Sequence, residues 1–108
     1  MKDDRLHIDR IKRAIEKIGS YLRDKKAGDL DSEPVLYDAV LMELLLIGEE
    51  ANRISDDYCA AHPKIPWQKM IGLRNRITHD YFRIDPKIVW ETCSTDIILL
   101  KEQLNDLG

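Results

Sequence analysis

Residues 40–48 of the chain read VLMELLLIG, and this is the longest hydrophobic stretch of the sequence, interrupted by Glu43. It is far shorter than the roughly 20 residues that a membrane-spanning helix needs. A helix built from it is hydrophobic on nearly every side, so it must be covered from more than one direction. We therefore expect a helix over residues 35–60 that either lies at the centre of the fold or faces a second subunit.

Hydrophobic residues before and after this stretch recur every three or four positions, which is the period of an amphipathic helix. The first series predicts a helix over residues 4–26 that ends before Gly28, and the second predicts a helix that starts after Asp85 and Pro86. The two series consist of Ile8, Ile11, Ile15, Ile18 and Leu22, and of Trp90, Cys93, Ile97, Leu100, Leu104 and Leu107.

Prolines mark where the expected helices are separated, because proline has no N–H group and fits only the first turn of a helix. Pro34 precedes the second helix, while Pro63 and Pro66 separate it from a short third helix over residues 67–79. The sequence therefore predicts an all-α protein, an up-and-down four-helix bundle with one domain over residues 1–108.

Composition and cysteine usage are typical of a cytoplasmic protein. Hydrophobic residues make up 44% of the chain and charged residues 34%, which is enough for a helical core and excludes a disordered chain. The first residues, MKDDRLHIDRIKR, carry charges throughout and do not form a secretory signal. Cys59 and Cys93 have no CxxC partner, so we expect two reduced thiols. We thus expect a cytoplasmic protein without a membrane segment.

Positive charge is concentrated in one part of the chain. Residues 64–87 contain six basic and two acidic residues, a local charge of +4 in a chain whose net charge is −3. Such a segment on an acidic protein could bind the phosphates of a nucleic acid, although a solvated basic face has the same composition. A metal site is disfavoured, because Cys59 and His62 have ligand-like spacing but no second pair follows.

Residues 73–81, LRNRITHDY, gather polar side chains suited to phosphodiester cleavage. The guanidinium of Arg74 can stabilise negative charge on phosphoryl oxygens, and the imidazole of His79 can accept or donate a proton near neutral pH. This chemistry requires neither a metal nor another cofactor. Spacing alone leaves a second interpretation open, in which the segment is the end of a surface helix with an unrelated histidine.

Helix geometry limits how these two side chains can act together. At about 100° per residue, Arg74 and His79 point roughly 140° apart. The helix must therefore end near His79, the arginine must bend round, or two chains must share the site. A two-fold dimer would bring a second copy of both residues to the same place. One stripe of this helix is expected to pack inward, and it consists of Met70, Leu73, Ile77 and Tyr81.

Four segments of the chain resemble, in family order, the HepT-like branch of the HEPN family. They are IGEEANRIS at residues 47–55, HPKIPW at 62–67, IGLRNRITHDYFRID at 71–85 and IVW at 88–90. The resemblance covers the chain from the second expected helix onward. Within it the family signature Arg-x4-His-x-Tyr corresponds to Arg74, His79 and Tyr81.

The resemblance implies a homodimeric, HEPN-like four-helix bundle in which Arg74 and His79 of both subunits line a cleft that cleaves RNA. Asn75 would be an auxiliary polar residue in that cleft. Members of the family are toxins of a toxin–antitoxin pair. Their partner is a minimal nucleotidyltransferase antitoxin, which silences the toxin by attaching AMP to the tyrosine of the signature. In this chain the acceptor would be Tyr81.

An alternative function belongs to another class of protein. In this alternative the chain is a catalytically inactive HEPN-like bundle, which uses the same basic face to recruit a nucleotidyltransferase partner or a nucleotide. Both interpretations leave the segment GEEANR open. Its charged residues either add to the cleft or form an ordinary charged helix face, and they are Glu49, Glu50 and Arg53.

Overall fold

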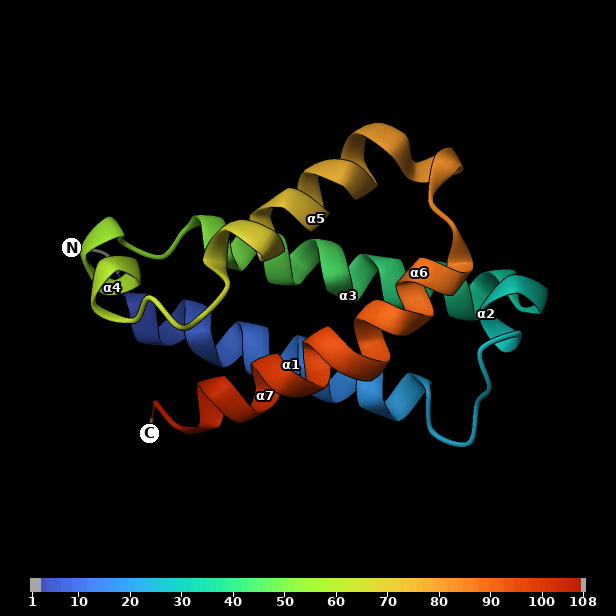
Figure 1. Ribbon diagram of the computed structural model, residues 1–108, viewed down its shortest axis with the longest axis horizontal. Coiled ribbons are helices and arrows are strands. Elements are labelled where there is room, and N and C mark those ends of the chain that lie inside the picture. The colour runs from blue at the N-terminus through green and yellow to red at the C-terminus, as the bar shows by residue number, and fades with distance from the viewer. Residues whose placement is uncertain (1–2, 108) are drawn as a thin grey trace.

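The computed structural model of the protein describes residues 3–107, and it confirms the predicted all-α fold, with no strand in that range. The long helices reverse direction one after another, and α6 continues into α7 through a π-turn (Figure 1). No helix among these residues is long and hydrophobic enough to cross a bilayer. The elements are α1 (Asp4–Tyr21), α2 (Asp29–Ser32), α3 (Pro34–Asn52), α4 (Asp56–Ala61), α5 (Trp67–Asp80), a 3₁₀ turn (Tyr81–Arg83), α6 (Pro86–Glu91), the π-turn (Thr92–Asp96) and α7 (Ile97–Asn105).

Helix α3 lies at the centre of this arrangement, which is one of the two positions that its hydrophobic sequence allowed. It packs against α1 on one side and α5 on the other, and α2 covers its beginning. The side chains that these neighbours bury are Val40, Leu41, Leu44 and Ile47. Two hydrophobic side chains of the same stretch, Met42 and Leu46, stay 54% and 39% exposed. The helix is therefore covered on several sides but keeps one open face.

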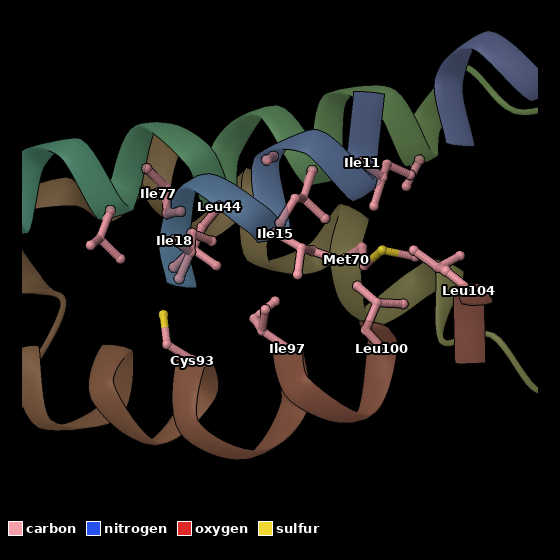
Figure 2. Packing of buried hydrophobic residues seen from close by; sticks show 14 of the residues in the cluster. Ile11, Ile15, Ile18, Leu44, Met70, Ile77, Cys93, Ile97, Leu100 and Leu104 are labelled. Atoms are coloured by element: carbon pink, nitrogen blue, oxygen red, sulfur yellow. The ribbon is translucent and has the colours of Figure 1, made fainter. Parts of the chain in front are cut away.

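The hydrophobic core fills the space between α1, α3, α5 and α7. Figure 2 shows Ile15 and Ile18 of α1 pointing toward Ile97 and Leu100 of α7, with Met70 of α5 lying beside them. Both predicted series are therefore core residues over most of their length. Cys93 also points into this core, where burial raises the pKa of its thiol to about 12, and neither cysteine forms a disulfide.

Two predicted helix ends are wrong. The first helix stops at Tyr21 instead of residue 26, and the chain could not continue as a helix to residue 26 because Asp24 adopts a left-handed conformation with φ of 62°. The helix predicted over residues 35–60 is divided, since α3 ends at Asn52 and Ser55 starts α4. The Ser55 hydroxyl accepts a hydrogen bond from the N–H of Tyr58 at 3.2 Å, which caps the new helix.

Ser55, in the break before α4, also binds the first turn of α1. Ser55 donates from its N–H and its hydroxyl to the two carboxylate oxygens of Asp4, at 2.8 and 2.7 Å. Asp4 lies in the first turn of α1, where a carboxylate interacts favourably with the helix dipole. This contact orients the end of α3 relative to α1, and the residues that precede it on α3 are those of the candidate site.

Candidate active site

Helices α3 and α5 are in close contact at Gly48. A side chain at this position would overlap the Cβ of Arg74 and would lie 2.6 Å from the backbone oxygen of Met70. Only glycine leaves room for this contact, because it has no Cβ. The stem of Arg74 is therefore pressed against the α3 backbone. Gly48 stands inside the segment that carried the resemblance, but its packing role could not be predicted without the helix contact.

The guanidinium of Arg74 is held by two partners. Its Nε donates a hydrogen bond to Oε1 of Glu49, and its Nη1 donates to Oδ1 of Asn75 at 2.7 Å. The Arg74 and Glu49 side chains are 33% and 28% exposed, so the ion pair is partly desolvated and still reachable from solvent. Such a group can bind a phosphate through its remaining donors. Asn75 lies beside Arg74, and Glu49 is a site residue that the sequence left undecided.

Glu50 and Arg53 occupy a different place from Glu49. Glu50 is buried on the α1 side of α3, where its Oε2 lies 2.5 Å from Nδ1 of His7. Arg53 approaches Glu50 and not Glu49, with 3.7 Å between its Nη1 and Oε1 of Glu50. Of the three charged residues in the segment GEEANR, one therefore contacts Arg74 and two face α1.

His79 lies in the last turn of α5 and is exposed. Within residues 3–107 its imidazole forms no hydrogen bond or ion pair, and it does not contact Arg74 through either kind of interaction. Both residues belong to one continuous helix, since α5 ends at Asp80. The divergence of about 140° that the sequence predicts therefore persists. A single chain does not bring the two functional groups together.

The exposure of Tyr81 contradicts one prediction from the sequence. Of the stripe expected to pack inward, Met70 and Ile77 are buried and Leu73 is half-buried, but Tyr81 is 37% exposed. The reason is local, because α5 ends at Asp80 and the tighter 3₁₀ turn rotates Tyr81 away from the stripe. Its ring packs edge-on against Phe82, with 5.0 Å between the ring centroids.

The hydroxyl of Tyr81 donates a hydrogen bond to the carboxylate of Asp38 on α3. This bond raises the pKa of Tyr81 above its ordinary value, with smaller contributions from partial desolvation, from the charge of Asp38 and from Tyr37. The contact joins the end of α5 to the beginning of α3, two helical turns or more from the Arg74–Glu49 pair. The phenol is therefore neutral near pH 7, reachable, and next to a proton acceptor.

The exposed face of α3 runs between these two contacts. It presents Met42 and Leu46 between Asp38, which binds Tyr81, and Glu49, which binds Arg74. Within residues 3–107 no three histidine, cysteine, aspartate or glutamate side chains are placed to hold a metal ion. The candidate site consists of the fixed guanidinium of Arg74, the exposed imidazole of His79 in the last turn of α5, and the phenol of Tyr81 directly after that helix.

Comparisons with known proteins point in one direction. A family model described as "Ribonuclease HepT-like" matches residues 11–107. A "Probable ribonuclease HepT" of Thermococcus cleftensis is 33% identical over 101 residues, which cover 94% of this chain and 92% of the relative. A "Gamma-glutamylcyclotransferase and putative RNase" of Methanocaldococcus jannaschii is 30% identical over 103 residues. These cover 95% of this chain, which spans about half (46%) of that relative. No solved structure matches the chain with significance.

Proposed function

The chain belongs to the HepT-like ribonuclease family, and we propose that it is a metal-independent endoribonuclease that cleaves RNA with Arg74 and His79 in a cleft between two copies of the chain. The observation that carries the proposal is the contrast between the two groups. Arg74 is held by Glu49 and Asn75 and keeps further N–H groups that can bind a phosphate, whereas His79 is exposed. A held cation and an accessible imidazole are the groups that this reaction needs.

In the proposed reaction the 2′-oxygen of RNA attacks the neighbouring phosphorus while its proton passes to an imidazole. A bond forms between the 2′-oxygen and phosphorus, and the bond from phosphorus to the 5′-oxygen breaks. The 5′-oxygen then takes a proton. One His79 cannot easily accept and donate in the same step, so the second proton comes from His79 of the other copy. Arg74 stabilises the negative charge that grows on the phosphoryl oxygens.

The exposed face of α3 supports the homodimer. Met42 and Leu46 lie one turn apart on this face, between the residues that bind Tyr81 and Arg74, and we take this hydrophobic surface beside the site as the dimer contact. We expect light scattering at micromolar concentration to give twice the chain mass of 12.6 kDa. Met42→Glu/Leu46→Glu should reduce it to the monomer mass. The control pair Ile98→Glu/Leu99→Glu, on residues of α7 that are 53% and 54% exposed, should remain a dimer. A monomeric wild-type protein would contradict this part of the proposal.

Cleavage is tested with purified wild-type protein, freed of any partner, and with two variants. His79→Ala should slow RNA cleavage by about 10²–10⁴-fold and Arg74→Ala by about 10²–10³-fold, while both variants still bind RNA. Arg23→Ala, an exposed arginine beyond α1, is the control and should cleave normally. If wild type and both site variants bind RNA equally and none cuts it, the chain is a binding module and the nuclease proposal fails.

The proposed partner is a minimal nucleotidyltransferase antitoxin, which attaches AMP to Tyr81. The phenol oxygen would attack the α-phosphorus of ATP, pyrophosphate would leave, and the proton would pass to Asp38, whose carboxylate already accepts the hydrogen bond of this hydroxyl. A bound adenylate two residues from His79 would obstruct RNA. Mass spectrometry after co-expression should find one or more AMP additions at Tyr81 in wild type and in Tyr58→Phe, and none in Tyr81→Phe. Unmodified protein beside an active partner would reject this regulation.

A further inference from the structure

A second group of cations lies on the α1 side of α3, around the buried carboxylate of Glu50. The Glu50 side chain is 10% exposed. Its Oε2 lies 2.5 Å from Nδ1 of His7, and its Oε1 lies 3.5 Å from Nη1 of Arg10 and 3.7 Å from Nη1 of Arg53. One buried negative charge therefore positions two arginines, one from α1 and one from the end of α3.

These two arginines keep most of their hydrogen-bonding capacity. Their side chains are 50% and 56% exposed. Distances of 3.5 and 3.7 Å are longer than the usual 2.7–3.2 Å of a hydrogen bond. A guanidinium carries five N–H donors, so both groups can bind a further anion without leaving Glu50. Because two arginines share one carboxylate, positive charge remains at the surface, and a phosphate is the anion that the planar fork fits best.

The carboxylate that positions these two arginines is next in sequence to the one that binds Arg74. Glu49 and Glu50 are consecutive, and they hold Arg74 of α5 and Arg10 of α1 on opposite sides of the helix. Arg53 is the residue that caps the end of α3, about one turn of roughly 5.4 Å beyond Glu49 along the helix axis. Arginines are therefore held on both sides of the last turns of α3, one on the α5 side and two on the α1 side.

We propose that Arg10 and Arg53 form a second phosphate subsite, which binds the RNA backbone next to the phosphate held by Arg74. This inference rests on the proposed nuclease function and deepens it by giving the substrate strand a path. A phosphate contact positions the strand and reads no base, so the subsite acts on RNA affinity and not on proton transfer. Glu50 and His7 serve it by orienting the two guanidinium groups.

The test measures binding of a short single-stranded RNA as a function of salt, in a His79→Ala background so that the RNA is not cut. Each lost phosphate contact lowers the slope of log K against log salt by about 0.7. Arg10→Gln/Arg53→Gln should therefore reduce the slope by about 1.4 and weaken binding on the order of tenfold. The matched pair Arg23→Gln/Lys101→Gln removes the same charge from exposed positions on α7 and beyond α1, and it should leave the slope unchanged.

Three further variants separate loss of the subsite from loss of charge or of folding. Arg10→Lys/Arg53→Lys retains both charges and should keep the slope, while losing affinity because an ammonium cannot make the two-pronged contact. If the double glutamine variant does not fold by circular dichroism, each single variant should lower the slope by about 0.7. An unchanged slope, or an equal loss in the control pair, would overturn the subsite while wild-type cleavage stands. Failure of the His79→Ala protein to bind RNA at all would remove the proposed function and the subsite together.

Discussion

The two halves of α5 differ in how firmly they are held. The first half is buried at Trp67 and Met70, touches α3 at Gly48, and ends at Arg74, whose guanidinium has two partners. The second half is buried only at Ile77 and is otherwise exposed. One helix thus carries a fixed cation and an open imidazole, which is what two different tasks require.

The physical reason for the difference lies in the chemistry assigned to each half. A group that stabilises charge acts best when it is already in place, since it then needs no reorganisation as the charge develops. A group that exchanges protons with the substrate must instead be reached by it. Close packing at Gly48 serves the first need, and the exposed last turn of α5 serves the second.

Among changes to residues that position the site, Gly48→Ala has the largest expected effect, because it disrupts the packing of the first half of α5. The new methyl group would overlap Arg74 and the Met70 carbonyl, so the helices must separate. We expect a loss of about 1–3 kcal/mol in the free energy of unfolding and about a 100-fold slower cleavage, because Arg74 is displaced. Thermal unfolding and cleavage rates measure both. Gly72→Ala, on the same helix with nothing within 4 Å, should instead stabilise by about 0.5–1 kcal/mol. Similar results for the two glycines would contradict the comparison.

Next in size is Glu49→Gln, which removes the charged partner of Arg74 and leaves the packing intact. Loss of one charge-assisted hydrogen bond should slow cleavage about tenfold and lower stability by no more than about 1 kcal/mol. Glu33→Gln is the control, since Glu33 pairs with Lys25 at 3.0 Å on the surface and far along the chain from Arg74. Cleavage should be unaffected in that variant. If Glu49→Gln cleaves as fast as wild type, the position of Arg74 does not depend on this pair.

A smaller effect is expected at the exposed end of α5, on the pKa of Tyr81. Asp38→Asn should lower the pKa of Tyr81, because the variant removes the carboxylate that binds the neutral phenol and opposes its ionisation. In the wild type the raised pKa means that this contact stabilises the fold fully below the ordinary value of 10.0, and that the stabilisation is lost as pH rises through the folded value. Ultraviolet titration measures the shift, and Tyr81→Phe identifies the signal. An unchanged titration would show that the contact is absent in solution.

The last prediction is that removal of metal ions has no effect on cleavage. If the two halves of α5 supply charge stabilisation and proton transfer between them, RNA cleavage should proceed at the same rate in EDTA. Cleavage that stops in EDTA and returns with added metal would show that a bound ion does part of this work.

Sequence periodicity predicted the parts of the fold that depend on buried side chains. The series through Ile11 and Ile15, and the one through Leu100 and Leu104, lie in the core as expected, because a helix has a fixed period. The division at residues 53–55 was missed, although Ser55 followed by two aspartates is a typical helix start. The hydrophobic pattern continues across that break and conceals it.

The candidate site could likewise be predicted only in part from the sequence. Arg74 and His79 could be selected from their chemistry and from the family resemblance, both of which are properties of the sequence. The roles of Gly48 and Glu49 depend on which helix packs against α5, and the exposure of Tyr81 depends on where α5 ends. Contacts between helices and the exact end of a helix are set by packing, and a single sequence does not specify them.

Chemical rescue tests the assignment of the two halves most directly. Because His79 is exposed, imidazole added to the His79→Ala variant can reach the vacated position and transfer the proton. Cleavage by this variant should rise with imidazole concentration, while Arg74→Ala, which lacks the held cation, should not respond. Equal responses of the two variants, or wild-type cleavage by His79→Ala without imidazole, would contradict the division of work along α5.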